Sequence, residues 1–307
     1  MNKQFTDLLA CPECHTHLII SVEKLSCANC TRLFPIIEGI PVFTQNIDEE
    51  QTKLSMKKFH ELYDEGKTSE EKLHIFAKKK IKEYFPFRKY LESLPDKKNG
   101  RFLELGIGGS IAIDTMTKKG YTIYGIDFSI TALKLTKHIA RIHKIPCFLV
   151  CADIAHPPFK ENTFDIIYGG GTLEHLEDTR QTLHQLYRIS KKNGFIVNTV
   201  PVVSISSLTY RQLSGNIPEV PILKQIFYFI HNKILRTRFM FTGYEKSFMP
   251  RTIRRWHKEA GFTQVKTFRY EFTPQLPHFP TKLKPFLQRI EKYRPFWTAI
   301  NVVGRKA

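Results

Sequence analysis

The stretch FLELGIGGS, residues 102–110, joins an apolar run to a glycine-rich turn. Glycines at 106 and 108 let the backbone turn sharply and approach a ligand closely. A dinucleotide-binding fingerprint would need its third glycine at position 111, which is isoleucine here. Glu104, two residues before the first glycine, suits a ligand with an ammonium group instead. The stretch therefore predicts a strand that ends in a ligand-binding loop.

Further apolar runs follow, with helical patterns at 130–143 and 180–190 between some of them. The runs are TIYGID (122–127), CFLVCAD (147–153), FDIIYG (164–169) and GFIVNTV (194–200). Such strand–helix alternation predicts an α/β fold with a parallel sheet covered by helices on both faces. Beyond an interruption at 201–250, the pattern predicts a helix at 250–261 and strands at 264–272 and near 297–306.

Acidic residues follow two of these strands. Asp127 ends the second strand, where a carboxylate can accept hydrogen bonds from both hydroxyls of a ribose. Phe128 beside it can pack on an adenine face. Asp153, in VCADI with Ile154, ends the third strand and can accept a hydrogen bond from an exocyclic amine. Each acid can instead be a helix N-cap or a solvated turn residue. Together with Glu104, however, they would line one crevice at the carboxyl edge of the sheet.

These segments resemble the class I S-adenosylmethionine-dependent methyltransferases of the broad small-molecule group, over about residues 75–307. Three more segments carry the likeness: FDIIYGGGTLEHL (164–176), LYRISKKNGFIVNTVP (186–201) and YEKSFMPRTIRRWHKEAGF (244–262). The resemblance implies a doubly wound, seven-stranded, mostly parallel sheet. It also implies that S-adenosylmethionine is the cofactor.

The same resemblance implies roles for individual residues. The strand-1 acid and glycines of the family, which hold the methionine moiety, match Glu104, Gly106 and Gly108. The ribose-binding acid matches Asp127, the adenine-binding acid matches Asp153, and a backbone contact after strand 4 falls near Gly170. The sequence departs from the family at Ser110, where a third glycine is usual.

Four of the six cysteines form a separate pattern near the amino terminus, with Cys11 and Cys14 in one Cys-x-x-Cys and Cys27 and Cys30 in a second. Four thiolates in two such knuckles make a closed tetrahedral shell, which indicates a structural Zn²⁺ site and not a catalytic one. The surrounding sequence is similar to the zinc-ribbon activator subunit that partners several methyltransferases. Cys147 and Cys151 stand apart in an apolar run and are expected to be buried thiols.

These patterns predict a zinc ribbon at 1–47, lead-in helices at 48–98 and a cofactor-binding domain at 99–307. We expect the ribbon and the catalytic domain to have separate cores. The insertion at 201–250 should build the acceptor pocket, since loops at this edge carry specificity. Within 221–241, apolar residues fall on one helical face, with basic residues largely elsewhere. Such a helix can lie on an anionic membrane, cap a pocket or pack on the core.

Charge is concentrated in one part of the chain. Lys and Arg exceed Asp and Glu by 14 over residues 201–307, where the counts are 19 and 5, out of a net charge of +18. A basic surface attracts nucleic acid, anionic lipid or acidic ligands, and it can also be simply a solvated face. No signal peptide or membrane span is expected, which favours a cytoplasmic protein, with peripheral membrane contact through 221–241 as one alternative.

The sequence indicates the cofactor more clearly than it indicates the methyl acceptor. We expect a small molecule, lipid-like or glycan-linked. The alternatives are tRNA or rRNA, favoured by the basic charge, and a non-catalytic scaffold that retains the cofactor fold. The chain lacks the motifs of amide-nitrogen and cytosine-carbon methylation. His175 is the best candidate for a general base if the acceptor is a hydroxyl, but we favour its interpretation as a helix-start histidine packed under the cofactor. We therefore assign no catalytic residue, and the sequence does not indicate the oligomeric state.

Overall fold

The computed structural model of the 307-residue chain describes most of the sequence outside two long segments. The described residues are 3–44, 90–108, 110, 112–205, 217–218, 246–270 and 281–307, with single positions at 222, 225, 226, 229, 233 and 234. Most of the expected lead-in helices at 48–98, and most of the 201–250 insertion, lie outside these residues. Within the described residues, none of the helices has the length and apolarity needed to span a membrane.

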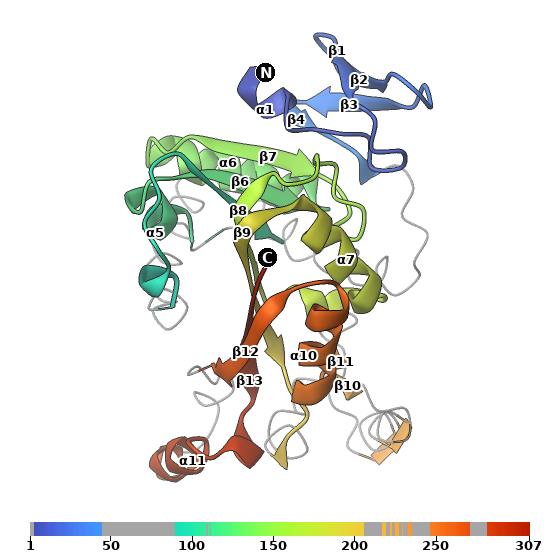
Figure 1. Ribbon diagram of the computed structural model, residues 1–307. Coiled ribbons are helices and arrows are strands. Elements are labelled where there is room, and N and C mark those ends of the chain that lie inside the picture. The colour runs from blue at the N-terminus through green and yellow to red at the C-terminus, as the bar shows by residue number, and fades with distance from the viewer. Residues whose placement is uncertain are drawn as a thin grey trace.

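A seven-stranded sheet forms the centre of the molecule, in the order β12-β13-β9-β8-β5-β6-β7 (Figure 1). Its strands are β5 (Gly100–Leu105), β6 (Tyr121–Asp127), β7 (Cys147–Cys151), β8 (Phe164–Gly170), β9 (Ser190–Pro201), β12 (Thr263–Arg269) and β13 (Ala299–Arg305). The pairs among β5 to β9 are parallel, and β13 is antiparallel to both of its neighbours. The predicted seven-stranded, mostly parallel sheet is confirmed.

Helices cover both faces of this sheet, and two of them begin at capping side chains. On one face lie α5 (Ile113–Lys118) and α6 (Ile130–Ile142), which buries Leu133 in the same cluster as Phe102. On the other face lie α7 (Thr179–Ile189) and α10 (Pro250–Glu259). The Ser129 hydroxyl accepts the Ala132 N–H at the start of α6, as an N-cap residue does.

The connection from β7 to β8 is different, because residues 152–163 contain no helix. Parallel strands are usually joined by a helical crossover, which covers the sheet face that it crosses. Here the face around Tyr124, Phe148 and Phe164 would remain open without another covering element.

The amino-terminal segment supplies this cover. It consists of α1 (Lys3–Thr6) and a four-stranded antiparallel sheet of β1 (Leu18–Ile20), β2 (Lys24–Cys27), β3 (Leu33–Ile37) and β4 (Ile40–Pro41). The Phe5 ring stacks on Phe148 with centroids 5.1 Å apart and lies 6.1 Å from Tyr124. Figure 1 shows this segment lying against the β6–β7 end of the large sheet. It thus takes the position of the missing helix.

Backbone pairing fastens both ends of the segment. Leu9 forms an antiparallel bridge with Phe159, and Val42 forms a parallel bridge with Cys151 at the end of β7. The Phe43 N–H donates to the carbonyl of Cys151 at 2.6 Å. The expectation of two separate cores is therefore wrong. Buried residues of the amino-terminal segment, such as Phe5 and Leu9, belong to the same hydrophobic cluster as Phe159 of the crossover.

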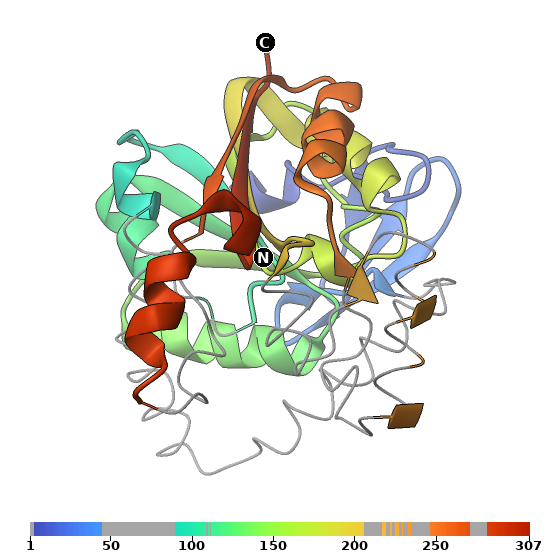
Figure 2. The same ribbon diagram turned by 90° about the horizontal axis from the view of Figure 1, so that it is seen from below.

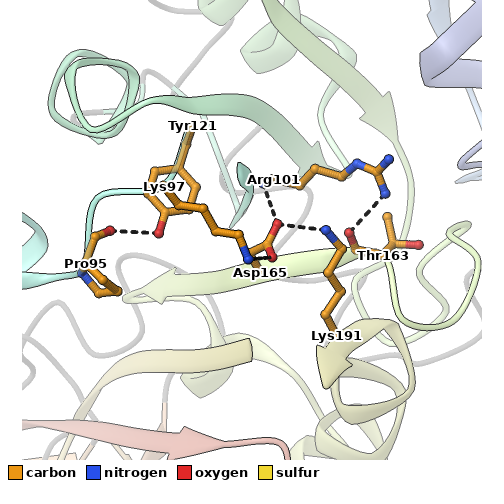
Figure 3. A network of polar contacts seen from close by, with 7 residues as sticks. All are labelled: Pro95, Lys97, Arg101, Tyr121, Thr163, Asp165 and Lys191. Atoms are coloured by element: carbon orange, nitrogen blue, oxygen red, sulfur yellow. Dashed lines mark hydrogen bonds and ion pairs between the residues drawn. The ribbon is translucent and has the colours of Figure 1, made fainter. Parts of the chain in front are cut away.

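A polar network closes the opposite, amino-terminal edge of the large sheet (Figure 3). The buried Asp165 carboxylate accepts from Lys97 Nζ at 2.7 Å, from Lys191 Nζ at 2.9 Å and from the Arg101 N–H at 2.8 Å. Burial alone would raise the pKa of Asp165, but these donors outweigh it and hold the pKa below its usual value. The network joins β5, β8 and β9 at the edge that binds no ligand in folds of this kind.

Candidate cofactor and metal sites

The expected cofactor residues meet at the carboxyl edge of the parallel strands. Glu104 lies near the end of β5, Asp127 ends β6, and Asp153 follows β7 by two residues. Since β5 pairs with β6 and β6 with β7 in parallel register, these acids lie along one edge of the sheet. Gly170 ends β8 at the same edge. The arrangement agrees with a crevice at the carboxyl ends of the strands.

The glycine turn has the conformation that its residues predict. Gly106 adopts φ +64°, a left-handed conformation that other residues rarely tolerate, and its N–H donates to the Ile126 carbonyl at 2.8 Å. A Cβ atom at this position would lie only 3.0 Å from Thr172 Oγ1. The Gly108 N–H donates to Asp127 Oδ2 at 3.1 Å. The turn is thus tied to the end of β6, with Gly106 exposed at its tip.

Ser110, the departure from the family pattern, has a defined role. Its hydroxyl donates to Glu104 Oε2 and accepts the Ala112 N–H at 3.1 Å. Both Glu104 and Ser110 are buried. Ser110 therefore orients the Glu104 carboxylate and joins it to the residues before α5. Sequence reasoning treated this serine only as a missing glycine.

Asp127 is almost completely buried, and burial raises its pKa to about 6. Its carboxylate accepts the Ser129 N–H at 2.8 Å in addition to that of Gly108. These two bonds position the carboxylate between the glycine turn and the start of α6. A carboxylate oxygen has further lone pairs, so both bonds leave acceptor capacity for ligand hydroxyls.

The third acid is held mainly by its own turn. Asp153 accepts the Ala155 N–H at 2.9 Å and contacts His156 Nδ1 at 3.0 Å. Phe128 is partly buried, and its carbonyl accepts the Cys151 thiol at 3.2 Å. Ile154 is buried in the hydrophobic cluster that contains the amino-terminal segment. The residues expected around an adenine therefore lie directly beside the covering segment.

The four paired cysteines form a compact sulfur cluster. The Sγ atoms of Cys11, Cys14, Cys27 and Cys30 all lie within 4.8 Å of one another. Individual separations are 3.7 Å for Cys11–Cys30 and 3.4 Å for Cys14–Cys27. A tetrahedral zinc ion with Zn–S bonds of about 2.3 Å needs such separations. The N–H groups of Asn29 and Cys30 both donate to Cys27 Sγ at 3.4 Å, which suits a metal-bound thiolate. The donor set fits a Zn²⁺ ion.

Several polar residues lie on β8, β9 and β13 and in the turn after β8. The partly buried His175 lies in the short helix η2 (Leu173–His175) after β8. The Thr199 hydroxyl of β9 donates to Asn301 Oδ1 of β13 at 2.6 Å. Tyr168 of β8 is completely buried, and burial raises its pKa well above the usual value.

Lys246 was missed by sequence reasoning. It lies in β11 (Lys246–Ser247), which forms a two-residue parallel pair with β10 (Ile217–Pro218). Although it is a lysine, it is only 2% exposed, and its Nζ donates to the Glu177 carbonyl at 2.9 Å. It thereby ties the end of the insertion to the loop that follows η2. Only the burial identifies it, because a single lysine in a basic segment has no distinctive sequence pattern.

Comparison with known proteins gives a family match for each of two segments of the chain. Residues 103–198 match the model of a methyltransferase domain, and residues 2–39 match that of the Trm112p-like proteins. The demethylmenaquinone methyltransferase of Lactiplantibacillus plantarum is 26% identical over 52% of this chain and 68% of its own length. The ubiquinone biosynthesis O-methyltransferase of Coxiella burnetii is also 26% identical, over 49% of this chain and 61% of its own length.

Other curated relatives are matched over only about half of their length. Among solved structures, the complex between the Haloferax volcanii Trm112 methyltransferase activator and a methyltransferase has a similar fold. It shows a TM-score of 0.50 at 16% identity and covers 85% of this chain and 99% of its own. Together with the sheet order, these matches show a methyltransferase domain with the class I methyltransferase fold, and a Trm112p-like domain in the same polypeptide.

Proposed function

We propose that the protein transfers the methyl group of S-adenosylmethionine to a small-molecule acceptor at the carboxyl edge of β8 and β9. The observation that carries this proposal is the meeting of Glu104, Asp127 and Asp153 around the glycine turn at one edge of the sheet. The names of the curated relatives, which act on demethylmenaquinone or in ubiquinone biosynthesis, favour a small and lipid-like acceptor.

We assign the cofactor contacts residue by residue. Glu104 and the glycine turn at 106–108 would hold the methionine end, and Asp127 would accept the ribose hydroxyls. Phe128, Asp153 and Ile154 would surround the adenine, and the backbone at Gly170 would contact the cofactor beside the acceptor. The fit rests on two features of the chain. Gly106 at the exposed tip has no side chain of its own, and Asp127 has acceptor capacity left.

The protein then contributes to the reaction mainly by positioning the acceptor relative to the methyl group. Bound S-adenosylmethionine supplies a methyl group already activated by its sulfonium charge. Holding the acceptor atom in line with it can supply most of the acceleration. A hydroxyl acceptor would also need a proton acceptor. His175 is the candidate for that role, and a purely structural role in η2 remains its alternative.

We propose a structural Zn²⁺ ion for the cysteine cluster, held by Cys11, Cys14, Cys27 and Cys30. A four-sulfur shell leaves no coordination position for a substrate. We also retain the division into a ribbon at 1–47, a linker at 48–98 and a cofactor-binding domain at 99–307 with an insertion at 201–250. The described residues of the ribbon and of the large domain share a hydrophobic core.

The finer identity of the acceptor is a proposal with two alternatives. A lipid-like or glycan-linked acceptor is favoured by the quinone-pathway relatives, and it agrees with exposed apolar side chains at Ile226 and Ile234 within the expected 221–241 helix. A tRNA or rRNA acceptor is favoured by the excess of 14 basic residues over 201–307. A non-catalytic scaffold is opposed by the complete set of acids at the strand ends.

Substitution of Asp127 tests the cofactor assignment. We expect Asp127→Ala to weaken S-adenosylmethionine binding by about 1–3 kcal/mol, because charge-assisted hydrogen bonds to the ribose are lost. Calorimetric titration measures this change. Since burial raises the pKa of Asp127 to about 6, affinity should also fall as the pH drops below 6 and the carboxylate takes up a proton. The same pH dependence should disappear in Asp127→Asn. Unchanged affinity in a folded Asp127→Ala variant would refute the ribose assignment.

A further inference from the structure

The segment around α11 (Lys284–Ile290) exposes large apolar side chains. Leu283, Phe286 and Tyr293 are 47%, 60% and 63% exposed. Leu287 and Glu291 of the same segment are buried, so the helix has a defined inner side that packs on the protein. We call the outer side of residues 282–294 the α11 surface. Within the part of the chain that the structure describes, the inner side of the helix packs on the protein and these apolar groups stay exposed.

Basic residues surround these apolar groups. Lys282, Arg289, Lys292 and Arg294 are exposed. The one acidic residue between 281 and 297 is Glu291, which is buried with its carboxylate 3.7 Å from Arg269. The α11 surface therefore combines a strong positive charge with three large apolar side chains and exposes no acidic group.

The position of the α11 surface relates it to the acceptor side. In Figure 1 the helix lies at the lower end of the molecule, where β9 ends and β13 begins. Figure 2, viewed from below, shows α11, in red, at the periphery of the molecule. The short described pieces of the insertion lie at the same end, and their Ile222 and Phe229 are also exposed.

A surface of this composition matches the interface of an anionic bilayer. Apolar side chains can enter the boundary between headgroups and acyl chains, while lysines and arginines contact lipid phosphates. A nucleic acid would use the basic residues and stack on the aromatic rings, but it would gain little from Leu283. The exposed leucine beside Phe286 thus favours lipid over nucleic acid.

We propose that the α11 surface docks on an anionic lipid surface and holds the acceptor side of the protein against it. Docking does not depend on methyl transfer, so it can be true whether or not the proposed acceptor is correct.

Vesicle sedimentation tests the docking with the full-length protein. We expect binding to vesicles of phosphatidylcholine with about one third phosphatidylglycerol, and little binding to pure phosphatidylcholine. Reversal of two charges by Lys282→Glu and Arg289→Glu should weaken binding at least about twentyfold, since each basic residue near an anionic surface contributes about a fivefold gain in affinity. Phe286→Asp should weaken it to a similar degree by removing apolar insertion.

Two control variants keep the test specific. Val22→Asp makes the same kind of change at a 94% exposed apolar residue of the ribbon and should leave vesicle binding unchanged. Arg251→Glu with Arg254→Glu reverses two exposed charges on α10 and should have a much smaller effect than reversal on the α11 surface. Thermal unfolding of each variant establishes that it is folded. Phe286→Ser replaces Phe286→Asp if the latter fails to fold.

Three outcomes would overturn the proposal. The first is an absence of binding to anionic vesicles by the wild-type protein. The second is binding that falls equally in the α10 and α11 charge variants, which would indicate unspecific attraction. The third is binding that is insensitive to Phe286→Asp but competed away by RNA, which would identify the basic residues as a nucleic-acid surface.

Discussion

The ribbon end of the molecule buries its aromatic side chain Phe5, whereas the end that carries α11 exposes Phe286. At the ribbon end, Phe5 is 3% exposed and packs on Tyr124 and Phe148 of the large sheet. At the acceptor end, Phe286 of a short surface helix stays in solvent. The first end completes a hydrophobic core, and the second offers apolar groups to something outside the chain. The ribbon interface therefore stabilises the fold, whereas recognition is what we propose for the exposed side chains at the other end.

Loss of the cysteine cluster should have the largest effect on stability. Cys11→Ser with Cys14→Ser removes two of the four expected zinc ligands, and we expect the free energy of unfolding to fall by about 5 kcal/mol or more. Because the ribbon shares a core with the large sheet, the whole chain should unfold in one transition at a lower temperature. Affinity for S-adenosylmethionine should fall as well, since Val42 and Phe43 pair with Cys151 close to Asp153.

Calorimetric melting, titration with S-adenosylmethionine and metal analysis of the purified protein check this prediction. The wild-type protein should hold one Zn²⁺ per chain, and the double variant should hold none. A double variant that binds the cofactor with wild-type affinity would show that the ribbon and the sheet are independent despite their common core. Cys147→Ser, outside the sulfur cluster, serves as a control for the metal content.

The same substitution at the two ends gives the sharpest comparison. Phe5→Ala should lower the free energy of unfolding by about 3–5 kcal/mol, because it leaves a cavity between the ribbon and the sheet. Phe286→Ala should change it by less than about 0.5 kcal/mol, since the ring contributes little to the core. Urea denaturation of both variants measures the difference. Similar losses in the two variants would mean that the contrast between the two ends is wrong.

A smaller loss of stability than at Phe5 is expected at the Asp165 network, which belongs to neither end. Asp165→Asn should cost about 1–2 kcal/mol at neutral pH, because Lys97 is half exposed and its ion pair is screened. The native pKa of this carboxyl is lowered, so its contribution is complete above pH 4, the approximate pKa of an unfolded aspartate. It is lost as the pH falls through the lowered native pKa. The gap in stability between wild type and variant should therefore close in acid, and a gap independent of pH would contradict the assignment.

Much of the large sheet could be predicted because local patterns in the sequence indicate its strands and helices. The apolar runs became β5 to β9, and the helix at 250–261 became α10 with Gly261 just past its end. The carboxyl-edge acids followed from the same logic, since parallel strands bring their ends together. The sulfur cluster followed from cysteine spacing alone.

Contacts between segments far apart in the sequence could not be predicted in this way. Pro157 and Pro158 argue locally against a helix in 152–163, but no local pattern shows that Phe5 covers the resulting face. The bond from Ser110 to Glu104 and the burial of Lys246 depend on how loops meet in space. These features are set by tertiary packing, which overrides single-residue tendencies.

Because the ribbon belongs to the same polypeptide as the large sheet, dilution of the protein does not separate the two. A cover bound as a separate subunit leaves when the concentration drops below the dissociation constant, and its supply can then control the domain beneath it. Here the Leu9–Phe159 and Val42–Cys151 bridges form within one chain, at an effective concentration on the order of millimolar or higher. The ribbon thus stays on the β7 side of the sheet however much protein the cell makes. One ribbon is present for every catalytic domain.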